Sequence, residues 1–494
     1  MYNIGLDIGT SFIKAALTER YTGNKVDVVT VPATEQKIIV FKDGWAEQNP
    51  EIWWKNTCRA IKKLLSINKI SSSLISGIGI SYQMHGLVLL DYYGNSLRNS
   101  IIWCDDRAVN IGKKAFNDIG KDKCIKNLLN SPANFTASKL KWVKNNEKEL
   151  YKNIHKFLLP GDYIAYRFSG KMTTTKMGLS EGMFWDFKNN SVADFLLKYY
   201  DIDSSLIPEI VPTFGLQCVL NKKGALECGL EENIPIFYRA GDQPNNALSL
   251  NVLKPGEIAT TAGTSGVIFA VTDDINTIES ERINNFLHLN IDESISIGKL
   301  LCINGAGVQY AKLKKKLLID SYDEMNKLSL TIGVGSEELT YLPFGNGSER
   351  MLGNTKVGSI MLNFDKTIHN NGHLIRATLE GIAFAFVYGM QILINDGVRP
   401  SVIRAGNDNL FKSKVFGDTI STLINTDIEI YETTGAIGAS RAVDLHDKDF
   451  NKFGKNIIDN DFLKTFTPQS NSSEYKKAYN LWVEKLELTL KQKM

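Results

Sequence analysis

The chain carries one short motif twice, and this repeat restricts its fold more than any other feature. An apolar stretch over residues 4–17 is interrupted by Gly-Thr-Ser at 9–11, and a second one over residues 258–271 is interrupted by Gly-Thr-Ser at 263–265. Each copy is typical of two strands that meet at a tight turn. Because the copies lie half a chain apart, the repeat has the size of a domain and not of a solenoid unit. We therefore expect an α/β chain with two related domains.

The residues at the first turn suit a polyphosphate. Gly9 allows a tight turn that leaves backbone N–H groups free, Thr10 and Ser11 add hydroxyl donors, and Lys14 adds a positive charge. Asp7 precedes the turn, where an acid can hold a hydrated Mg²⁺ against phosphate oxygens. On its own this stretch is more typical of an ordinary hairpin. The second copy favours a nucleotide held across a cleft between two domains.

Chain length and local punctuation define the expected domains. A chain of 494 residues is long for one hydrophobic core. The Lys-Pro-Gly stretch at 254–256 is the clearest break between the two repeats. We therefore expect a first domain over residues 1–253, a second over residues 254–446 and a polar helical tail over residues 447–494. Within the first domain, residues 105–233 resemble a mostly helical insertion that shapes a pocket.

Composition and charge argue against several classes of protein. Hydrophobic residues make up 43% of the chain and charged residues 22%, as in ordinary globular proteins. The net charge of +3 comes from lysines spread among acids, so no nucleic-acid partner is expected. The cysteines show no CxxC spacing and are typical of reduced thiols. No leader precedes the first strand and no apolar run is long enough to span a membrane, so we expect a cytoplasmic protein without a membrane partner.

Polar residues follow several of the expected strands. The strand over residues 75–81 is followed by Gln-Met-His-Gly at 83–86, and the strand over residues 235–238 is followed by Asp242. In the second half, a glycine-bearing stretch follows the strand at 402–404. Ligands commonly bind outside the carboxyl ends of parallel strands. These stretches are therefore candidate parts of a binding site.

Phosphoryl transfer to an alcohol needs a cradle for the nucleotide phosphates, a divalent cation, and a carboxylate that accepts the alcohol proton. The two Gly-Thr-Ser turns are the candidate cradle, Asp7 is the candidate cation ligand, and Asp242 is the candidate base. A lone aspartate after a strand is otherwise often a helix cap. Neither a P-loop nor the protein-kinase motifs occur in the chain, so a nucleotide site must be of another type.

An ordered set of motifs resembles those of the FGGY carbohydrate kinases. The set consists of Leu-Asp-Ile-Gly-Thr-Ser at 6–11, Gln-Met-His-Gly at 83–86, Trp-Cys-Asp-Asp-Arg at 103–107, Thr-Ala-Ser-Lys-Leu-Lys-Trp at 136–142, Gly-Asp-Gln at 241–243, Thr-Ala-Gly-Thr-Ser-Gly at 261–266, Tyr-Leu-Pro at 341–343 and Arg-Ala-Thr-Leu-Glu-Gly at 376–381. The likeness covers residues 2–445. It implies the actin-like ATPase fold, in which two ribonuclease H-like domains hold Mg-ATP in the cleft between them and the sugar lies mainly in the first.

The resemblance also implies roles for individual residues on the sugar side. Asp242 matches the general base, which would accept the proton from O5 of D-xylulose. Met84 and His85 match a pair that contacts the sugar, whereas Asp105 and Arg107 either reach the sugar or pair with each other. The residues expected to bind the substrate are Gln83, Met84, His85, Asp105, Arg107 and Asp242.

On the nucleotide side, the matching residues are Thr10, Ser11, Lys14, Gly263, Thr264, Gln309, Gly406 and Asn409, with Asp7 as the Mg²⁺ ligand. Gly406 could instead be a packing glycine, and Gln309 an exposed helix residue. The family often carries consecutive glycines at the adenine rim, whereas this chain has alanine at position 405. This departure concerns the adenine contacts and not the fold.

The activity implied by the resemblance is the phosphorylation of a ketopentose by ATP. The Gln-Met-His-Gly motif favours D-xylulose, converted to D-xylulose 5-phosphate, over ribulose, gluconate, rhamnulose or glycerol. Cys104 and the Gln-Pro pair at 243–244 depart from the family's pattern and could alter the preference. A non-catalytic ATP switch or a sugar sensor of the same fold is the alternative class, but neither needs Asp242 beside a sugar pocket. We expect a small-molecule sugar and ATP as partners, and a homodimer by resemblance only.

Overall fold

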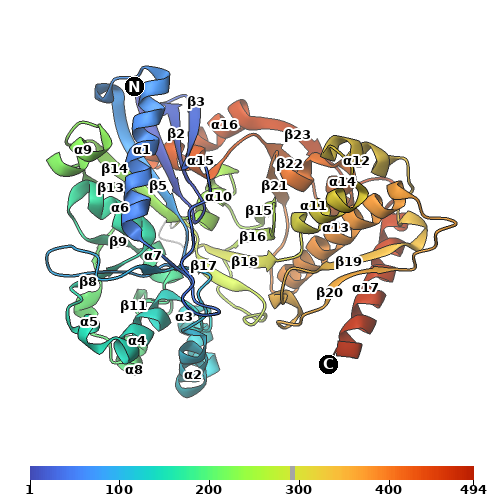
Figure 1. Cartoon of the computed structure of the whole chain (residues 1–494), viewed down its shortest axis with the longest axis horizontal. Coiled ribbons are helices and arrows are strands. Elements are labelled where there is room, and N and C mark those ends of the chain that lie inside the picture. Colours follow the sequence, from blue (N-terminus) through green and yellow to red (C-terminus); the bar gives the residue numbers. More distant parts are fainter. Residues whose placement is uncertain (290–294, 494) are drawn as a thin grey trace. The chain divides into compact units, whose positions relative to one another are not determined.

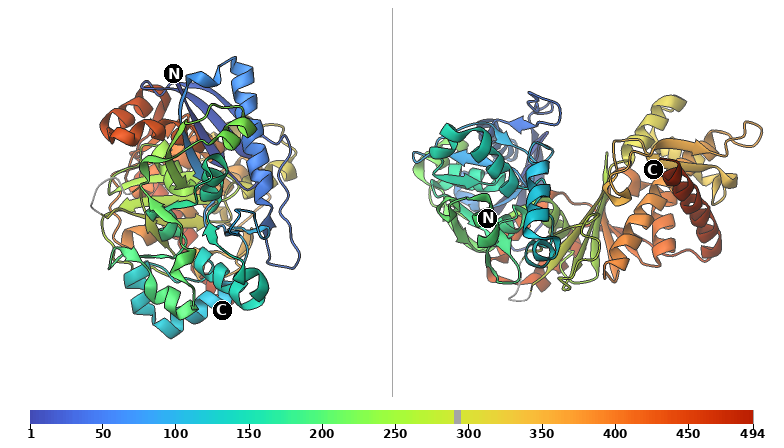
Figure 2. Two further views of the ribbon diagram at one scale, coloured as in Figure 1. Left: turned by 90° about the vertical axis from the view of Figure 1, so that its left-hand side faces the viewer. Right: turned by 90° about the horizontal axis from the view of Figure 1, so that it is seen from below.

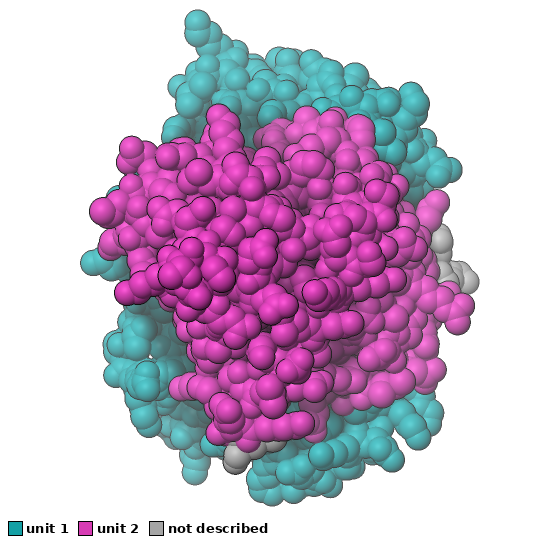
Figure 3. Space-filling view, turned by 90° about the vertical axis from the view of Figure 1, so that its right-hand side faces the viewer, with its two compact units in different colours: residues 1–251, 286–297, 433–460 teal, residues 252–285, 298–432, 461–494 magenta. Residues whose placement is uncertain are grey.

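The computed structural model describes residues 1–289 and 295–493 and divides into two compact units, which Figure 3 distinguishes by colour. Unit 1 comprises Met1–Asn251, Phe286–Ile297 and Thr433–Asn460. Unit 2 comprises Val252–Asn285, Gly298–Glu432 and Asp461–Met494. The two largest sheets of the chain have six and seven strands.

The units differ from the expected domains in three segments, of which Phe286–Ile297 belongs to unit 1 although it lies within the expected second domain. The first change of unit falls at residue 252, next to the expected boundary. Residues 433–460, however, belong to unit 1, and residues 461–494 belong to unit 2, where the sequence had suggested one continuous domain and a separate tail. The physical reason is that α15 (Gly435–Arg441) packs on the first sheet and β23 (Phe462–Phe466) extends the second.

The sheet of unit 1 has the strand order β13-β14-β5-β1-β2-β3. Its strands are β1 (Tyr2–Ile8), β2 (Ile13–Glu19), β3 (Lys25–Val31), β5 (Ile75–Tyr82), β13 (Phe214–Val219) and β14 (Pro235–Gly241). β5 runs parallel to both β1 and β14, and the outer pairs are antiparallel. The expected first hairpin is confirmed, with the Gly9 N–H donating to the Phe12 carbonyl across the turn at 3.1 Å.

Helices cover both faces of this sheet (Figures 1 and 2). On one face lie α1 (Pro50–Asn68), α6 (Pro160–Ser169) and α9 (Lys222–Cys228), with the apolar side of α1 in the core. The Asn49 side chain caps α1 and Pro50 occupies its first turn, as the sequence predicts. On the other face α15 packs against β1 and β5, and α10 (Asp242–Ser249) packs against α15.

The other elements before residue 252 include the expected, largely helical insertion. They are β4 (Glu47–Gln48), η1 (Ser72–Leu74), β6 (Val88–Leu90), β7 (Ser100–Ile101), α2 (Val109–Ile119), α3 (Lys121–Leu128), α4 (Thr136–Asn146), α5 (Lys148–Lys152), β8 (Lys156–Leu158), β9 (Thr173–Thr175), α7 (Lys176–Glu181), β10 (Trp185–Asp186), β11 (Ser191–Val192), α8 (Asp194–Tyr200), η2 (Ser204–Leu206) and β12 (Glu209–Val211). The insertion also supplies β13 to the main sheet, a strand that the sequence did not reveal.

The second sheet has the strand order β17-β18-β16-β15-β21-β22-β23. Its strands are β15 (Glu257–Ala262), β16 (Gly266–Thr272), β17 (Asn284–Leu287), β18 (Ile297–Ile303), β21 (Val402–Gly406), β22 (Ile428–Tyr431) and β23. β15 and β16 form the second expected hairpin. The other elements of unit 2 are α11 (Gly307–Leu317), α12 (Tyr322–Leu330), η3 (Ser336–Glu338), β19 (Thr340–Phe344), η4 (Arg350–Leu352), β20 (Gly358–Leu362), α13 (Asn371–Asn395), η5 (Asn409–Lys412), α14 (Lys414–Ile424) and α17 (Ser472–Lys493). The elements η6 (Ala442–Asp447) and, except for its last residue, α16 (Phe450–Asp461) belong to unit 1.

Contrary to the expectation from the sequence, one helix, α13, is long and apolar enough to cross a membrane, with a mean hydropathy of 1.6 over its most apolar window. In the structure 83% of that window is buried. Its side chains join the hydrophobic core of unit 2 together with residues of β16, α14 and α17. A buried core helix explains the composition of α13 without a membrane.

The closest approach between α15 and the sheet of unit 1 occurs at two strand glycines. A Cβ atom added at Gly5 would lie 1.9 Å from the Ala436 carbonyl oxygen, and one added at Gly79 would lie 1.9 Å from the Ala439 carbonyl oxygen. Real Cβ atoms do not approach backbone oxygens so closely. The two glycines therefore let this helix lie directly on the strands.

We predict that Gly5→Ala destabilises unit 1 by about 1–3 kcal/mol, because the helix must move away from the sheet. The measurement is the midpoint of thermal or urea unfolding. Gly333→Ala is the matched control, since a Cβ atom there would meet nothing within 4 Å. An unfolding midpoint of Gly5→Ala equal to that of the control would show that the close approach of α15 is not required.

Candidate active site

Three parallel strands of unit 1 end side by side. In the register of the sheet, Tyr82 at the end of β5 pairs with Ile8 at the end of β1 and with Gly241 at the end of β14. The residues that follow are the first Gly-Thr-Ser turn, the Gln-Met-His-Gly segment and Asp242. The fold therefore brings three predicted site segments to one edge of one sheet, where ligands of α/β proteins commonly bind.

Asp242 is the first residue of α10 and is partly exposed at this edge. Burial, and secondarily the negative charge of Asp7, raises the pKa of Asp242 to about 7. Hydrogen bonds from Gln243 to the carboxylate oppose this rise, and the N-cap residue of the helix is Gly241. A carboxyl group with a pKa near neutrality can accept a proton efficiently at physiological pH. The raised pKa therefore suits a general base.

Asp7 lies at the end of β1, directly opposite Lys14 of β2. Burial raises the pKa of Asp7, and this shift is opposed by the charge of Lys14 and by a hydrogen bond from Ser81. Within residues 1–289 and 295–493, no group of three or more His, Cys, Asp or Glu side chains is arranged to hold a metal. Mg²⁺ needs no such cage, because it commonly binds one or two carboxylates, water and substrate phosphates. Asp7 fits that limited role.

The first turn is joined to Gln83 by hydrogen bonds. The Thr10 hydroxyl donates to Gln83 Oε1 at 2.9 Å and accepts from Trp103 Nε1 at 3.0 Å. Gln48 Nε2 donates to the Thr10 carbonyl at 2.8 Å, and Gln83 Nε2 donates to Gln48 Oε1 at 3.3 Å. Gln83 is only 2% exposed. Its amide is thus engaged within the protein, while Ser11 beside it stays partly exposed.

His85 is held in one orientation and one tautomer. Its backbone is in the left-handed region, with φ +61°. Its Nδ1 lies 3.0 Å from the Glu181 carbonyl oxygen, and its ring packs edge-on against Phe135. A carbonyl oxygen can only accept, so Nδ1 carries the proton and Nε2 keeps its lone pair. Burial, reinforced by the nearby Lys139 ammonium, lowers the pKa of His85 to about 3.

Asp105 and Arg107, for which the sequence left two roles open, pair with each other. The Arg107 guanidinium donates to both oxygens of Asp105, with Nη2 at 2.7 Å, and the Ala46 N–H donates to the same carboxylate at 2.6 Å. Arg107 also lies 2.8 Å from Glu47 and stacks over the Trp45 ring. Both charged side chains are fully buried. This pairing places them behind the surface that a sugar could touch.

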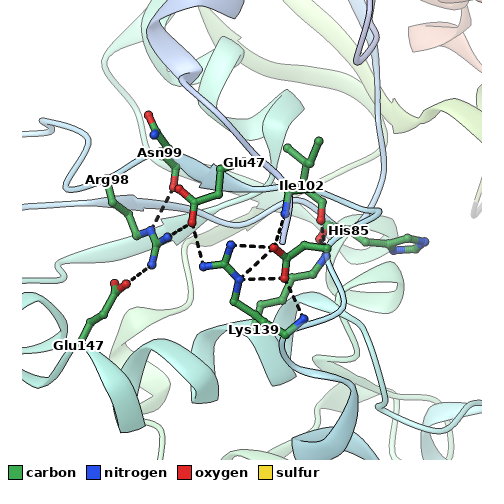
Figure 4. Close-up of polar contacts among 10 residues, drawn as sticks. Glu47, His85, Arg98, Asn99, Ile102, Lys139 and Glu147 are labelled. Atoms are coloured by element: carbon green, nitrogen blue, oxygen red, sulfur yellow. Dashed lines mark hydrogen bonds and ion pairs between the residues drawn. The ribbon is translucent and has the colours of Figure 1, made fainter. Parts of the chain in front are cut away.

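Glu47, which pairs with Arg107, belongs to a larger network of polar contacts (Figure 4). Glu47 also accepts a hydrogen bond from the Arg98 guanidinium, which in turn forms an ion pair with Glu147. Lys139 on α4 donates to two backbone carbonyls of the same region. Neither Lys139 nor Glu181 had been predicted as a site residue. Their residue types give no local signal for this role, because they reach the site only through the packing of α4 and α7.

Unit 2 contains a separate cavity of about 610 Å³ beside its own Gly-Thr-Ser turn. Gly263 and Thr264 line it, and the Gly307 N–H at the start of α11 donates to the Gly263 carbonyl at 2.8 Å. Another wall is formed by Tyr310 and Tyr322, whose rings stack at 5.5 Å. The volume lies in the range of small-molecule and cofactor sites.

Gln309 and Gly406, also predicted to bind the nucleotide, are not among the residues that line this cavity. Gln309 is 2% exposed and accepts a hydrogen bond from the Tyr341 hydroxyl at 3.1 Å, so it is not an exposed helix residue. Gly406 ends β21, and a Cβ atom there would meet only Asp408, at 3.7 Å, so packing does not require a glycine. The side chain of Asn409 lies outside the described part of the structure.

Comparison with known proteins decides the family. Residues 2–249, half of the chain, match the N-terminal domain of the FGGY family of carbohydrate kinases. The chain belongs to this family. The predicted enzyme class, a carbohydrate kinase, is therefore confirmed.

Individual relatives cover nearly the whole chain. The xylulose kinase of Staphylococcus xylosus is 27% identical over an alignment of 494 residues that covers 97% of this chain and 99% of that protein. Among solved structures, xylulose kinase from Rhodospirillum rubrum aligns with a TM-score of 0.87 at 22% identity, covering 100% of this chain and 99% of the other. Plasmodium falciparum glycerol kinase with ADP aligns with a TM-score of 0.89 at 19% identity, covering 99% and 98%. These structural matches confirm the predicted actin-like ATPase fold.

We predict that His85 stays neutral, with the proton on Nδ1, throughout the pH range from about 5 to 8 in which a free histidine titrates. The measurement is a long-range ¹H–¹⁵N correlation spectrum of the imidazole groups, in which the His85 signals are assigned by their loss in His85→Gln. A His85 signal that titrates within this range, or that shows a protonated Nε2, would contradict the orientation described above.

Proposed function

We propose that this protein transfers the γ-phosphoryl group of ATP to a ketopentose, with D-xylulose as the preferred substrate and D-xylulose 5-phosphate and ADP as products. Relatives covering most of the chain are xylulose kinases, including those of S. xylosus and of Escherichia coli, the latter 26% identical over 453 residues. The observation that carries the proposal is the placement of Asp242, with its raised pKa, at the same sheet edge as the Gln-Met-His-Gly segment.

In this proposal the residues of unit 1 bind and activate the sugar. Asp242 accepts the proton from O5 as that oxygen attacks the γ-phosphorus, and the β–γ phosphate bond breaks to leave ADP. Met84 and His85 contact the sugar, and the unprotonated Nε2 of His85 accepts a hydrogen bond from a sugar hydroxyl. Gln83 holds the Thr10 hydroxyl in place by a hydrogen bond. The buried Asp105–Arg107 pair supports the site without touching the sugar.

The ATP-side assignments remain proposals of the same kind. Thr10, Ser11 and Lys14 of the first turn, and Gly263 and Thr264 of the second, are the proposed phosphate-facing residues. For the nucleoside, the stacked Tyr310 and Tyr322 offer an apolar aromatic wall in the unit 2 cavity. Gln309, Gly406 and Asn409 were expected there by resemblance, and of these Gly406 has the open side that a ligand could approach.

Mg²⁺ is the cation that we propose at Asp7. When bound, it would neutralise part of the charge on the nucleotide phosphates. Lys14 lies opposite Asp7 in the hairpin and supplies a fixed positive charge close by. We also propose that the protein is cytoplasmic and that it forms a homodimer.

The function is tested by a coupled ADP-release assay of the purified protein with Mg-ATP and a set of acceptors. We expect the highest kcat/KM with D-xylulose, compared with D-ribulose, L-ribulose, L-rhamnulose, D-gluconate and glycerol, and little ADP release without sugar. A preference for another acceptor would show that the protein is a kinase with a different substrate. ADP release at the same rate with and without sugar would contradict the proposed function and favour an ATP switch.

We predict that Asp242→Ala lowers kcat by about 10²- to 10⁴-fold, because no other carboxylate takes the proton of the attacking hydroxyl. The fold, measured by circular dichroism, and ATP binding, measured by calorimetry, are expected to be retained. Asp43→Asn is the matched control, since Asp43 is exposed in the loop before β4. Turnover of Asp242→Ala equal to that of the control would remove Asp242 from the mechanism.

A further inference from the structure

Lys139 is a fully buried lysine in the first turn of α4. Its Nζ atom donates to the carbonyl oxygens of His85 and Ile102, both at 2.9 Å, as Figure 4 shows. Lysines are rarely fully buried, because an ammonium group loses its hydration there. A buried lysine that contacts two backbone carbonyls and no exposed surface needs an explanation in the local structure.

Both carbonyls belong to segments that carry proposed site residues. The His85 carbonyl follows a backbone torsion φ of +61°, which is uncommon for a residue with a side chain. The Ile102 carbonyl precedes Trp103, whose indole N–H donates to the Thr10 hydroxyl. One Nζ atom thus ties together the turn that presents His85 and the turn that reaches the first Gly-Thr-Ser loop.

The surroundings of Lys139 are arranged to tolerate its charge. Burial lowers the pKa of Lys139 to about 7, and the main opposing influence is the attraction of the buried Asp105 carboxylate. Asp105 is itself fixed by Arg107 and by the Ala46 N–H. Whether charged or neutral, an amine retains the two N–H bonds that these carbonyls accept.

We propose that Lys139 is a positioning residue, which holds the His85 backbone in its left-handed conformation and so directs the imidazole Nε2 toward the sugar. Asp105, held in place by Arg107, is the nearby counter-charge of Lys139. Lys139 has no exposed surface and does not touch the substrate. This inference rests on the proposed function for its kinetic consequence, but its structural part concerns His85 alone.

The test compares Lys139→Met, which keeps the length of the side chain but has no donor, with Lys141→Met on the same helix. Lys141 is partly exposed and serves as the matched control. We expect Lys139→Met to lower kcat/KM for the sugar by about 10- to 100-fold, because small displacements of a positioning group have effects of this size. The KM for ATP should change less than twofold. Lys141→Met should behave as the unchanged protein.

A double-mutant cycle separates positioning from a general effect on the fold. In the His85→Gln background, Lys139→Met should cost little further activity, since its effect passes through His85. Full additivity of the two losses would overturn the proposal. A lowered unfolding midpoint with an unchanged kcat/KM for the sugar would likewise show that Lys139 only stabilises the fold.

Two further measurements keep the test decisive. If Lys139→Met does not fold, Lys139→Gln replaces it, and the same selective loss in sugar kcat/KM is expected because its shorter amide cannot serve both carbonyls. The imidazole ¹⁵N shifts of His85 report on the structural part without any turnover. Changed shifts in the Lys139 variant, with no sugar phosphorylated by the unchanged protein, would refute the function and keep the positioning role. Unchanged shifts would refute the positioning role.

Discussion

The arrangement of unit 1 depends on the register of three parallel strands. Tyr82 pairs with Ile8 on one side and with Gly241 on the other, so the chain leaves the sheet at the same level three times. A shift of one residue in either pairing would turn the following side chains to the opposite face. The proposed base, the proposed sugar-facing segment and the proposed phosphate turn thus come together because of backbone pairing, independently of contacts between their side chains.

Behind this edge, buried charges fix positions more than they add stability. The network is fully buried at Arg107 and Asp105 and nearly so at Glu47. It becomes more exposed toward its outer end, where the side chain of Glu147 is 28% exposed. Buried ion pairs often contribute little net stability, because desolvation offsets their attraction. Their geometry is nevertheless strict, since removing one partner leaves an unpaired charge. Such a network suits a scaffold that must hold two loops in place.

The sequence was sufficient for features that rest on local chemistry. The hairpins at Gly9 and Gly263 and the capped start of α1 at Pro50 follow from turn and helix signals within a few residues. Contacts between distant segments could not be predicted in this way. The return of α15 to the sheet of unit 1 depends on close packing against Gly5, and the choice between the two roles left open for Asp105 and Arg107 depends on burial by neighbouring segments. Lys139 lies in the motif at 136–142, but the sequence predicted no role for it, because its partners are backbone carbonyls of distant segments.

The site also restrains its own ionisation. Burial raises the pKa of Glu181 well above its usual range, although this acid lies 3.9 Å from His85 Nδ1. An ionised Glu181 would favour the imidazolium form of His85, whereas burial of the ring and the nearby Lys139 disfavour it. The sheet edge therefore presents a neutral hydrogen-bond acceptor at His85 and a titratable carboxyl at the partly exposed Asp242. That division suits a polyhydroxy ligand, which needs neutral acceptors for recognition and one base at the reacting oxygen.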